Sequence, residues 1–373
     1  MALTKGDDFP IHQTSEPVAY SGTDRNFYDR YFFNGYGLEG NCFFALAFGV
    51  YPHLNIADAA FCLIRDGVQT DLHASRWLNM ERMDLRVGPI SIEVAEPLRR
   101  LILKVEAPDQ GLRAQIIFTG RAFPVEEPRF IRRNGPRAFM DYTRLTQNGR
   151  YEGWVELDGL RESVDGFVGT RDRSWGIRPV GARDQQEAVP AAPPQFFWIW
   201  SPTNFATGSF FFHTNDDAAG APWNRRAVWA PDGAEAGGMS EIADCAIAID
   251  WQAGSRHAAR AVVSINEGGG QRRLTFEPQQ QFLMSGLGYG HPRWGHGLAH
   301  GTLEVEREDR ALAEVDWAQP QNLHIQALCQ VTSRDGTGRE IVGRGVLEQL
   351  ALGPHAPSGL TGLIDPPPAT DRP

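Results

Sequence analysis

Short segments in which apolar and polar residues alternate recur along the chain at a spacing of roughly ten residues, which is typical of an antiparallel β-meander. Residues 90–94, 101–105 and 112–119 are three successive examples. Dipeptides that favour tight turns lie between such segments, namely Asp66-Gly67, Asp158-Gly159, Asp165-Gly166, Asp232-Gly233 and Asp335-Gly336. No window keeps apolar residues on one helix face for three turns. The pattern therefore predicts an all-β chain.

The alternation is interrupted at Ala182–Gln195, where the sequence ARDQQEAVPAAPPQ is polar and then rich in alanine and proline. Proline cannot donate a hydrogen bond to a β-ladder, so this segment is not an interior strand. We interpret it as a linker and predict two β domains, residues 1–185 and residues 186–353. Residues 354–373 form a proline-rich tail that is predicted to fray.

Aromatic residues become frequent directly after this break, in QFFWIWSPTNFATGSFFFH at residues 195–213. The favoured interpretation is a central strand that is buried on both faces. The alternative is an aromatic wall of a hydrophobic cavity, which includes Trp198. A short echo links the two halves, because an arginine precedes Trp-Gly at 171–176 and again at 292–295. The echo favours two tandem barrels of similar architecture.

Composition narrows the class of protein. The chain has 373 residues, of which 42% are hydrophobic and 22% charged, as in globular proteins. A formal charge of −10 argues against general nucleic-acid binding, which needs a basic face. No apolar run is long enough to span a membrane, and the first residues lack the apolar core of a signal peptide. The four widely spaced cysteines predict reduced, buried thiols and a cytoplasmic location.

The segment GTRDRSWGIRP, residues 169–179, places several charges around one tryptophan in what the pattern predicts to be a strand. Alternation puts Arg171, Arg173 and Trp175 on one face, and Asp172 with Ser174 on the other. We interpret the cluster as a charged girdle at a pocket, in which Asp172 is a candidate acid. The alternative, an ion-pair network that only braces the strand, stays open.

Two other segments carry candidate chemistry. In the segment 141–159, the side chains of Tyr142 and Arg144 share one face and Asp141 lies on the other. Tyr142 or Asp141 is a candidate proton-handling group, and the favoured alternative is an ordinary barrel strand. The segment GHPRWGHGLAH holds His291, His296 and His300, but on different strand faces and without a completing ligand pattern. We therefore predict no metal site. Nucleotide-binding glycine motifs and GxSxG are absent, so no cofactor is predicted.

The segments at 29–53, 141–159 and 168–179 resemble the carotenoid hydratase (hydroxyneurosporene synthase) family, and the whole chain resembles an uncharacterised bacterial branch of it. The resemblance implies two tandem lipocalin-like barrels, a large apolar pocket and acid–base catalysis without a cofactor. Asp172 matches the acidic position proposed to protonate an alkene, followed by Trp175-Gly176. The chain departs from the family by having Thr170-Arg171 in place of Tyr-His, and the neighbouring arginine is expected to lower the pKa of Asp172.

The resulting functional hypothesis is a cofactor-independent hydratase, cyclase or isomerase that acts on a terpenoid, steroid or related polycyclic substrate. The alternative is a non-catalytic carrier of the same kind of molecule. A homodimer is left open. The candidate catalytic residues are Asp172, Tyr142 and His291, and the candidate substrate-binding residues are Arg171, Arg173, Trp175, Arg144, Trp198, Trp294 and His296.

Overall fold

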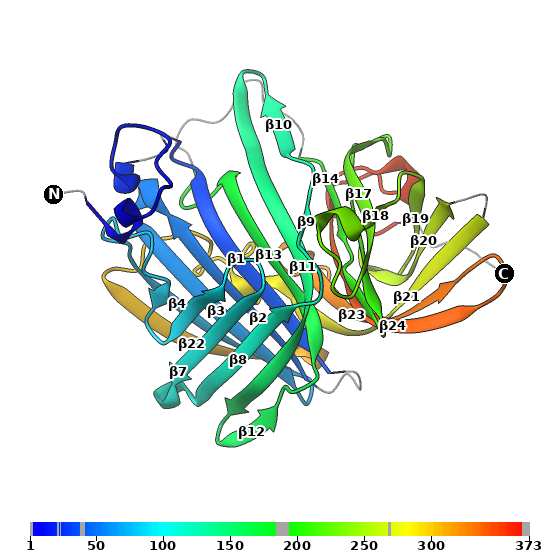
Figure 1. Ribbon diagram of the computed structural model, residues 1–373. Coiled ribbons are helices and arrows are strands. Elements are labelled where there is room, and N and C mark those ends of the chain that lie inside the picture. The colour runs from blue at the N-terminus through cyan, green and yellow to red at the C-terminus, as the bar shows by residue number, and fades with distance from the viewer. Residues whose placement is uncertain are drawn as a thin grey trace.

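The computed structural model describes residues 3–20, 22, 24–37, 42–183, 194–267 and 270–367. Its regular structure is β-sheet with short 3-10 turns, and the described residues contain no α-helix. Two antiparallel sheets stand side by side, with the β10–β11 hairpin rising above them (Figure 1). The predicted all-β class is confirmed.

The first sheet has the strand order β22-β4-β3-β2-β1-β13-β11-β8-β7-β6-β5, and β9, β10 and β12 pair with β11. Its strands are β1 (Phe27–Tyr36), β2 (Phe43–Tyr51), β3 (Ile56–Arg65), β4 (Val68–Trp77), β5 (Arg86–Val87), β6 (Ile90–Glu96), β7 (Arg100–Ala107), β8 (Leu112–Gly120), β9 (Val125–Glu126), β10 (Phe130–Asn134), β11 (Arg137–Leu157), β12 (Leu160–Ser163), β13 (Val168–Ile177) and β22 (Leu303–Ala311). The sheet curls into a nearly closed barrel. Its two edges come close together, since Gly88 after β5 lies against Leu303 and Val305 of β22.

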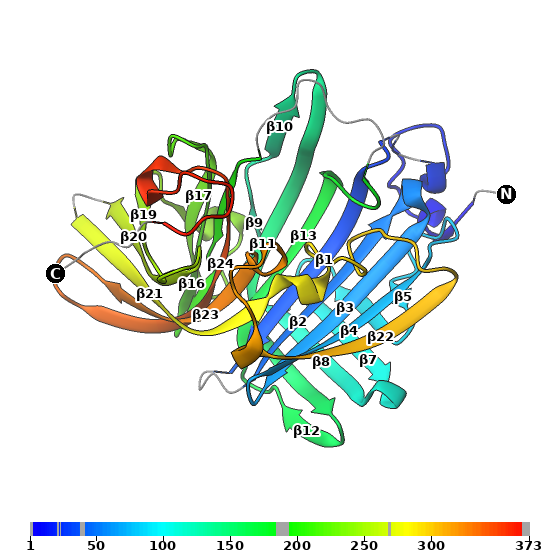
Figure 2. The ribbon, with the colours of Figure 1, turned by 180° about the vertical axis from the view of Figure 1, so that it is seen from behind.

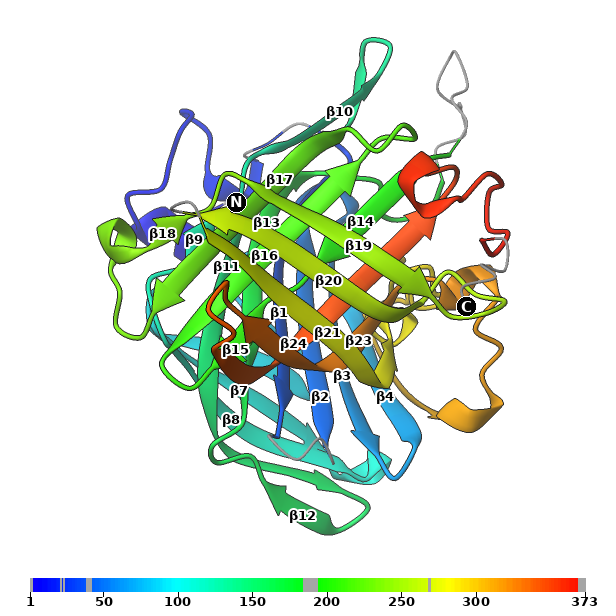
Figure 3. The ribbon, with the colours of Figure 1, turned by 90° about the vertical axis from the view of Figure 1, so that its right-hand side faces the viewer.

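The second sheet has the order β18-β17-β16-β14-β24-β23-β21-β20-β19, and β15 pairs with β16 and β24. Its strands are β14 (Phe196–Trp200), β15 (Thr203–Phe205), β16 (Gly208–Asp216), β17 (Pro222–Pro231), β18 (Ser240–Glu241), β19 (Cys245–Trp251), β20 (Ala258–Glu267), β21 (Gly270–Leu283), β23 (Ile325–Arg334) and β24 (Glu340–Leu352). Figure 3 views this sheet from its own side of the molecule. Strands β14 and β16 are almost wholly buried, as the aromatic-rich sequence predicts.

Short 3-10 helices lie in the connections. They are η1 (Lys5–Asp8), η2 (Val18–Tyr20), η3 (Pro52–Leu54), η4 (Pro108–Gln110), η5 (Ala236–Gly238), η6 (Met284–Leu287), η7 (Leu312–Glu314), η8 (Pro320–Asn322) and η9 (Ala356–Ser358). No helix of the described chain is long and apolar enough to cross a membrane.

Turn chemistry and alternation explain the local structure. At Asp66-Gly67 and Asp158-Gly159 both residues have positive φ, as type I′ hairpin turns require. These turns join β3 to β4 and β11 to β12 with regular register. On β1, Phe33 packs inside the first barrel while Phe32 packs between the two sheets, as the period of two dictates. Side chains fill the interior of the first barrel, and a separate apolar cluster fills the second sheet.

One strand crosses between the halves. After β21 the chain leaves the second sheet, passes over the outer face of β1–β4 and adds β22 to the edge at β4 (Figure 2). The sequence echo has no structural counterpart, because Trp175 lies within β13 whereas Trp294 lies in the crossing segment. The sheet changes between β13 and β14, on either side of the predicted linker, of which residues 184–193 lie outside the described residues. The domain boundaries stay a prediction.

The described part of the predicted tail is held in place. Arg256 is buried and its guanidinium donates hydrogen bonds to the carbonyl oxygens of Gly362 and Asp365, at 2.8 and 2.7 Å. The expectation of fraying is therefore wrong for residues up to 365, since these bonds tie them to the second sheet. Residues 368–373 lie outside the described residues.

Gly35 permits the close packing of β1 on β2. A Cβ atom there would lie 2.3 Å from the ring of Phe44, which is fully buried. Overpacking a dense core costs about 1–3 kcal/mol. We expect Gly35→Ala to lower the free energy of unfolding by that amount in denaturant titrations, and Gly237→Ala, where no atom lies within 4 Å, to leave it nearly unchanged.

Candidate functional site

A cavity of about 780 Å³ lies between the two sheets. Its walls come from the β10–β11 hairpin, the segment after β13, and strands β14 and β24. Tyr142, Arg144, Trp198 and Glu348 are among its lining residues. Its size is that of a small-molecule site. The expected pocket is thus present, but between the sheets rather than inside the first barrel, which side chains fill.

Asp172 lies in β13, paired with Phe32 of β1 on one side and Thr146 of β11 on the other. Its side chain is on the face that turns towards the second sheet, and it is partly accessible. No residue in the described chain forms a hydrogen bond or ion pair with its carboxylate. Burial raises the pKa of Asp172 to about 7, while Arg144 acts to lower that pKa and Glu127 and Glu348 raise it. Asp172 is therefore a carboxyl group that can hold a proton near neutral pH.

Arg144 is locked in a buried ion pair. Its Nε and Nη2 donate to one oxygen of Glu127, at 2.9 and 2.6 Å. Thr146 and the indole N–H of Trp200 donate to the other oxygen, at 2.5 and 3.3 Å. Burial would raise the pKa of Glu127, but Arg144 outweighs it and holds that pKa below its ordinary value. Glu127 is thus an anion that neutralises Arg144 and does not donate a proton.

Glu348 is a second buried carboxylate at the cavity. It accepts hydrogen bonds from Trp198 Nε1 at 2.9 Å, His324 Nε2 at 2.8 Å and Gln326 Nε2 at 2.7 Å. These donors outweigh burial and lower the pKa of Glu348. The network fixes the Trp198 ring in the cavity wall, where the guanidinium of Arg144 lies 4.5 Å from its centroid.

Tyr142 places its ring in the cavity wall by stacking on Phe130, with centroids 4.5 Å apart. Burial is the largest cause of its raised pKa, so the phenol keeps its proton. Within the described chain its hydroxyl has no hydrogen-bond partner. Tyr142 therefore offers the cavity a donor at neutral pH. Of the predicted site residues, the structure brings Tyr142, Arg144 and Trp198 together in the cavity lining. Asp172 does not line the cavity, but it lies close enough for Arg144 and Glu348 of the lining to influence its pKa.

Three predicted residues lie elsewhere around β13. Arg171 points into the first barrel, where its Nε donates to Gln147 at 2.7 Å. Arg173 pairs with Asp29, and Trp175 is 38% exposed. None of them lines the cavity. The charges of Arg171 and Asp172 interact, as expected for neighbours. Burial is nevertheless the largest influence on Asp172, so the pKa of its carboxyl is raised rather than lowered.

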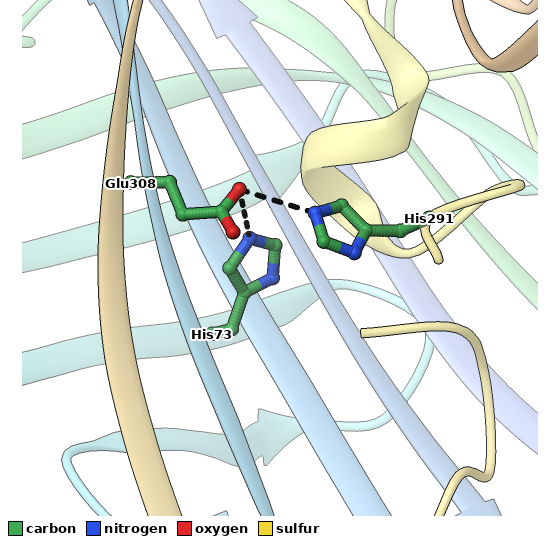
Figure 4. A group of neighbouring side chains, drawn as sticks. All are labelled: His73, His291 and Glu308. Atoms are coloured by element: carbon green, nitrogen blue, oxygen red, sulfur yellow. Dashed lines mark hydrogen bonds and ion pairs between the residues drawn. The ribbon is translucent and has the colours of Figure 1, made fainter. Parts of the chain in front are cut away.

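The histidines of the crossing segment separate. His291 joins His73 of β4 and Glu308 of β22 in a cluster that does not line the cavity (Figure 4). Its Nδ1 accepts from the amide of Trp294 at 2.8 Å, so its Nε2 carries the proton and donates to Glu308 at 3.1 Å. Trp294 stacks on His73 with an interplanar angle of 6°.

The ligand atoms of His73, His291 and Glu308 lie within 4.8 Å of one another, so this cluster could hold a metal ion. Two features oppose it. To bind a metal ion through Nε2, His291 would have to lose the proton on that atom, and Nδ1 cannot take the proton because it already accepts from a backbone amide. In addition, Arg310 places its positive charge 3.4 Å from Glu308. Glu308 is engaged by His291 and Arg310, whereas His73 Nε2 lies 3.8 Å from Glu308 and has no hydrogen-bond partner among the described residues.

Sequence reasoning missed Glu127, His324 and Glu348, whereas Arg178 belongs to the predicted charged girdle and lines the cavity. Glu127, which supports the cavity through Arg144, lies in the polar PVEEPRF segment, and Glu348 in an ordinary alternating strand. No local pattern marks them. Glu127 and His324 lie outside the strands, and Glu348 lies in β24 on a face that becomes internal only when the two sheets meet.

Comparison with known proteins gives the fold and a family. A model of a family of unknown function matches residues 3–361. No curated protein matches the sequence. The crystal structure of CghA superposes with a TM-score of 0.53 at 10% identity, covering 88% of this chain and 89% of that one. The likeness to CghA shows the fold alone, which is of the predicted lipocalin-like type.

Two further structures are similar over most of their length. A candidate ATTH of Nitrosomonas europaea gives a TM-score of 0.49 at 14% identity, covering 92% of this chain and 98% of that one. Kievitone hydratase from Nectria haematococca gives 0.45 at 12% identity, covering 94% and 95%.

Proposed function

Since the chain belongs to the family of unknown function DUF8625, we propose its activity from the cavity: cofactor-independent acid–base catalysis on a hydrophobic small molecule. The reaction class is a hydratase, cyclase or isomerase. CghA shares the fold, and a fold alone does not define chemistry. The observation that carries the proposal is Asp172, whose carboxyl has no hydrogen-bond or ion-pair partner among the described residues, whose pKa is about 7, and whose charge interacts with Arg144 and Glu348 of the cavity lining.

In this mechanism Asp172 donates a proton to an alkene or enol carbon and takes one back at the end of the cycle. A general acid is most effective when its pKa is near the working pH. The Tyr142 hydroxyl donates a hydrogen bond to developing negative charge on a substrate oxygen. Trp198 and the Arg144 guanidinium present flat faces to the substrate's rings or double bonds.

The alternative is a carrier that binds the same kind of molecule without changing it. Chromatography separates the two hypotheses: purified protein is incubated with prenyl and steroid substrates, without metal or cofactor, and product formation is followed. A carrier retains its ligand unchanged, whereas an enzyme shows turnover in proportion to its concentration. Binding without turnover across the panel would contradict the catalytic proposal.

The pH dependence follows from the protonated form. Because Asp172 acts as an acid only with its proton, we expect kcat to be constant below about pH 7 and to fall by about tenfold per unit above it. Burial is the largest cause of the raised pKa of Asp172, which Glu127 and Glu348 also raise and which Arg144 and Arg30 lower. The pKa values of Glu127 and Glu348 are themselves lowered, so both stay negatively charged through this pH range. A rate that rises with pH through this range would contradict the assignment of Asp172 as the acid.

A further inference from the structure

The cavity is strongly cationic. Among the described residues that line it are seven arginines and a single carboxylate, Glu348. The arginines are Arg25, Arg132, Arg133, Arg137, Arg144, Arg178 and Arg183. Glu348 is already bound by three hydrogen-bond donors. This charge differs from the purely apolar lining that a hydrocarbon substrate needs.

Several of these arginines have partners of their own. Arg144 is neutralised by Glu127 at 2.6 Å. Arg25 donates to the carbonyl oxygens of Val180 and Ala182, at 3.0 and 2.7 Å. Among the described lining residues, arginines outnumber carboxylates, so the lining carries more cationic than anionic side chains.

Arg178 lies where two guanidinium groups share one neutral acceptor. It faces Arg30 across His296, whose Nδ1 lies 3.2 Å from Arg178 Nη2 and 3.4 Å from Arg30 Nη1. His296 Nε2 donates to the carbonyl oxygen of Leu287 at 2.8 Å, and burial, with both arginines, lowers its pKa, so His296 is neutral. The single lone pair on His296 Nδ1 is therefore the shared acceptor for the guanidinium groups of Arg178 and Arg30.

No carboxylate within the described chain forms an ion pair with Arg178 or Arg30. Asp58, the carboxylate that influences both, is engaged by the Tyr51 hydroxyl at 3.1 Å and the Gly297 amide at 2.7 Å. The Nε atoms of Arg178 and Arg30 are buried without a hydrogen-bond partner. A buried cation without an anion is costly unless a ligand supplies one.

We propose that Arg178 and the arginine-rich wall form an anion-binding subsite, and that the ligand of the cavity carries a carboxylate or phosphate beside its hydrophobic body. The inference rests on the proposed function only in placing the ligand in the same cavity. Arg178 supplies the charge next to the Tyr28 and Tyr289 rings, which lie 4.5 and 5.4 Å from its guanidinium carbon. Guanidinium groups match the geometry of both oxyanions.

Isothermal titration calorimetry with three probes that share one chain tests this: dodecanoate, dodecyl phosphate and dodecanol. We expect the wild-type protein to bind at least one anionic probe about tenfold or more tightly than dodecanol, which identifies the preferred head group. Arg178→Gln is expected to reduce that preference to within about twofold. Arg178→Lys keeps the charge and most of the preference, and the matched control Arg113→Gln, an exposed arginine outside the cavity, leaves it unchanged.

Measurements on the wild-type protein alone can overturn the anion-binding subsite. Either equal affinity for dodecanol and both anions, or no measurable binding of either anion, would do so. A preference that survives Arg178→Gln overturns the role of Arg178. These outcomes are separate from failure of the catalytic proposal, which is judged by turnover and by the pH profile rather than by the head group that binds.

Discussion

Replacing Asp172 by asparagine is expected to lower kcat by about 10²–10⁴-fold, the usual contribution of a general acid. Asparagine keeps the size of the side chain but has no transferable proton. The variant should be at least as stable as the parent. Folding raises the pKa of Asp172 to about 7, so the charged form is disfavoured in the native state and stability falls as pH rises towards that value. Asparagine removes this penalty.

Asp141→Asn is the matched control, because Asp141 lies on the neighbouring strand, pairs with the exposed Arg129 and does not line the cavity. Its turnover should equal that of the parent. Thermal denaturation at pH 6 and pH 8 measures the stability of both variants. Should Asp172→Asn unfold at a much lower temperature while its residual turnover stays high, Asp172 is a structural group and not the acid.

Arg144→Met is expected to lower the free energy of unfolding by about 3–5 kcal/mol, the cost of leaving one member of a buried ion pair without its partner. The Glu127 side chain is fully buried and would keep a negative charge between Trp200 and His213. Methionine fills much of the space of the arginine stem, so the loss reports on charge. Denaturant titrations measure it.

The double variant Glu127→Gln/Arg144→Met removes both charges and should regain a large part of that loss. A double variant as unstable as Arg144→Met would indicate that packing against Trp198 and Phe130, rather than the ion pair, is what Arg144 provides. The two single variants and the double variant together form a double-mutant cycle.

The features that follow from local alternation could be predicted from the sequence. The period of two correctly placed Asp172 with Ser174 opposite Arg171 and Arg173, and Tyr142 with Arg144 on one face of β11. The Asp-Gly pairs at 66–67 and 158–159 correctly marked hairpin turns, because positive φ values are a local property. Asp165-Gly166 lies between β12 and β13, which do not pair with each other. The cysteines are free and buried, as their spacing indicated.

Features that depend on the meeting of the two sheets could not be predicted in this way. The pKa of Asp172 is set by burial and by charges of Glu127 and Glu348, which are far away in sequence. His291 finds His73 and Glu308 only because the chain crosses back to the first sheet. The cavity is lined by residues from both halves of the chain, although its seven arginines all come from the first half.

The pairing of β22 with β4 also sets an order for folding during synthesis. While the ribosome makes β14–β21, the outer edge of β4 has no strand of its own chain to pair with, because residues 303–311 have not yet been synthesised. An open edge of this kind can pair with another chain. Completion of the first sheet is therefore a late event in synthesis, and until then the β4 edge is available for such pairing.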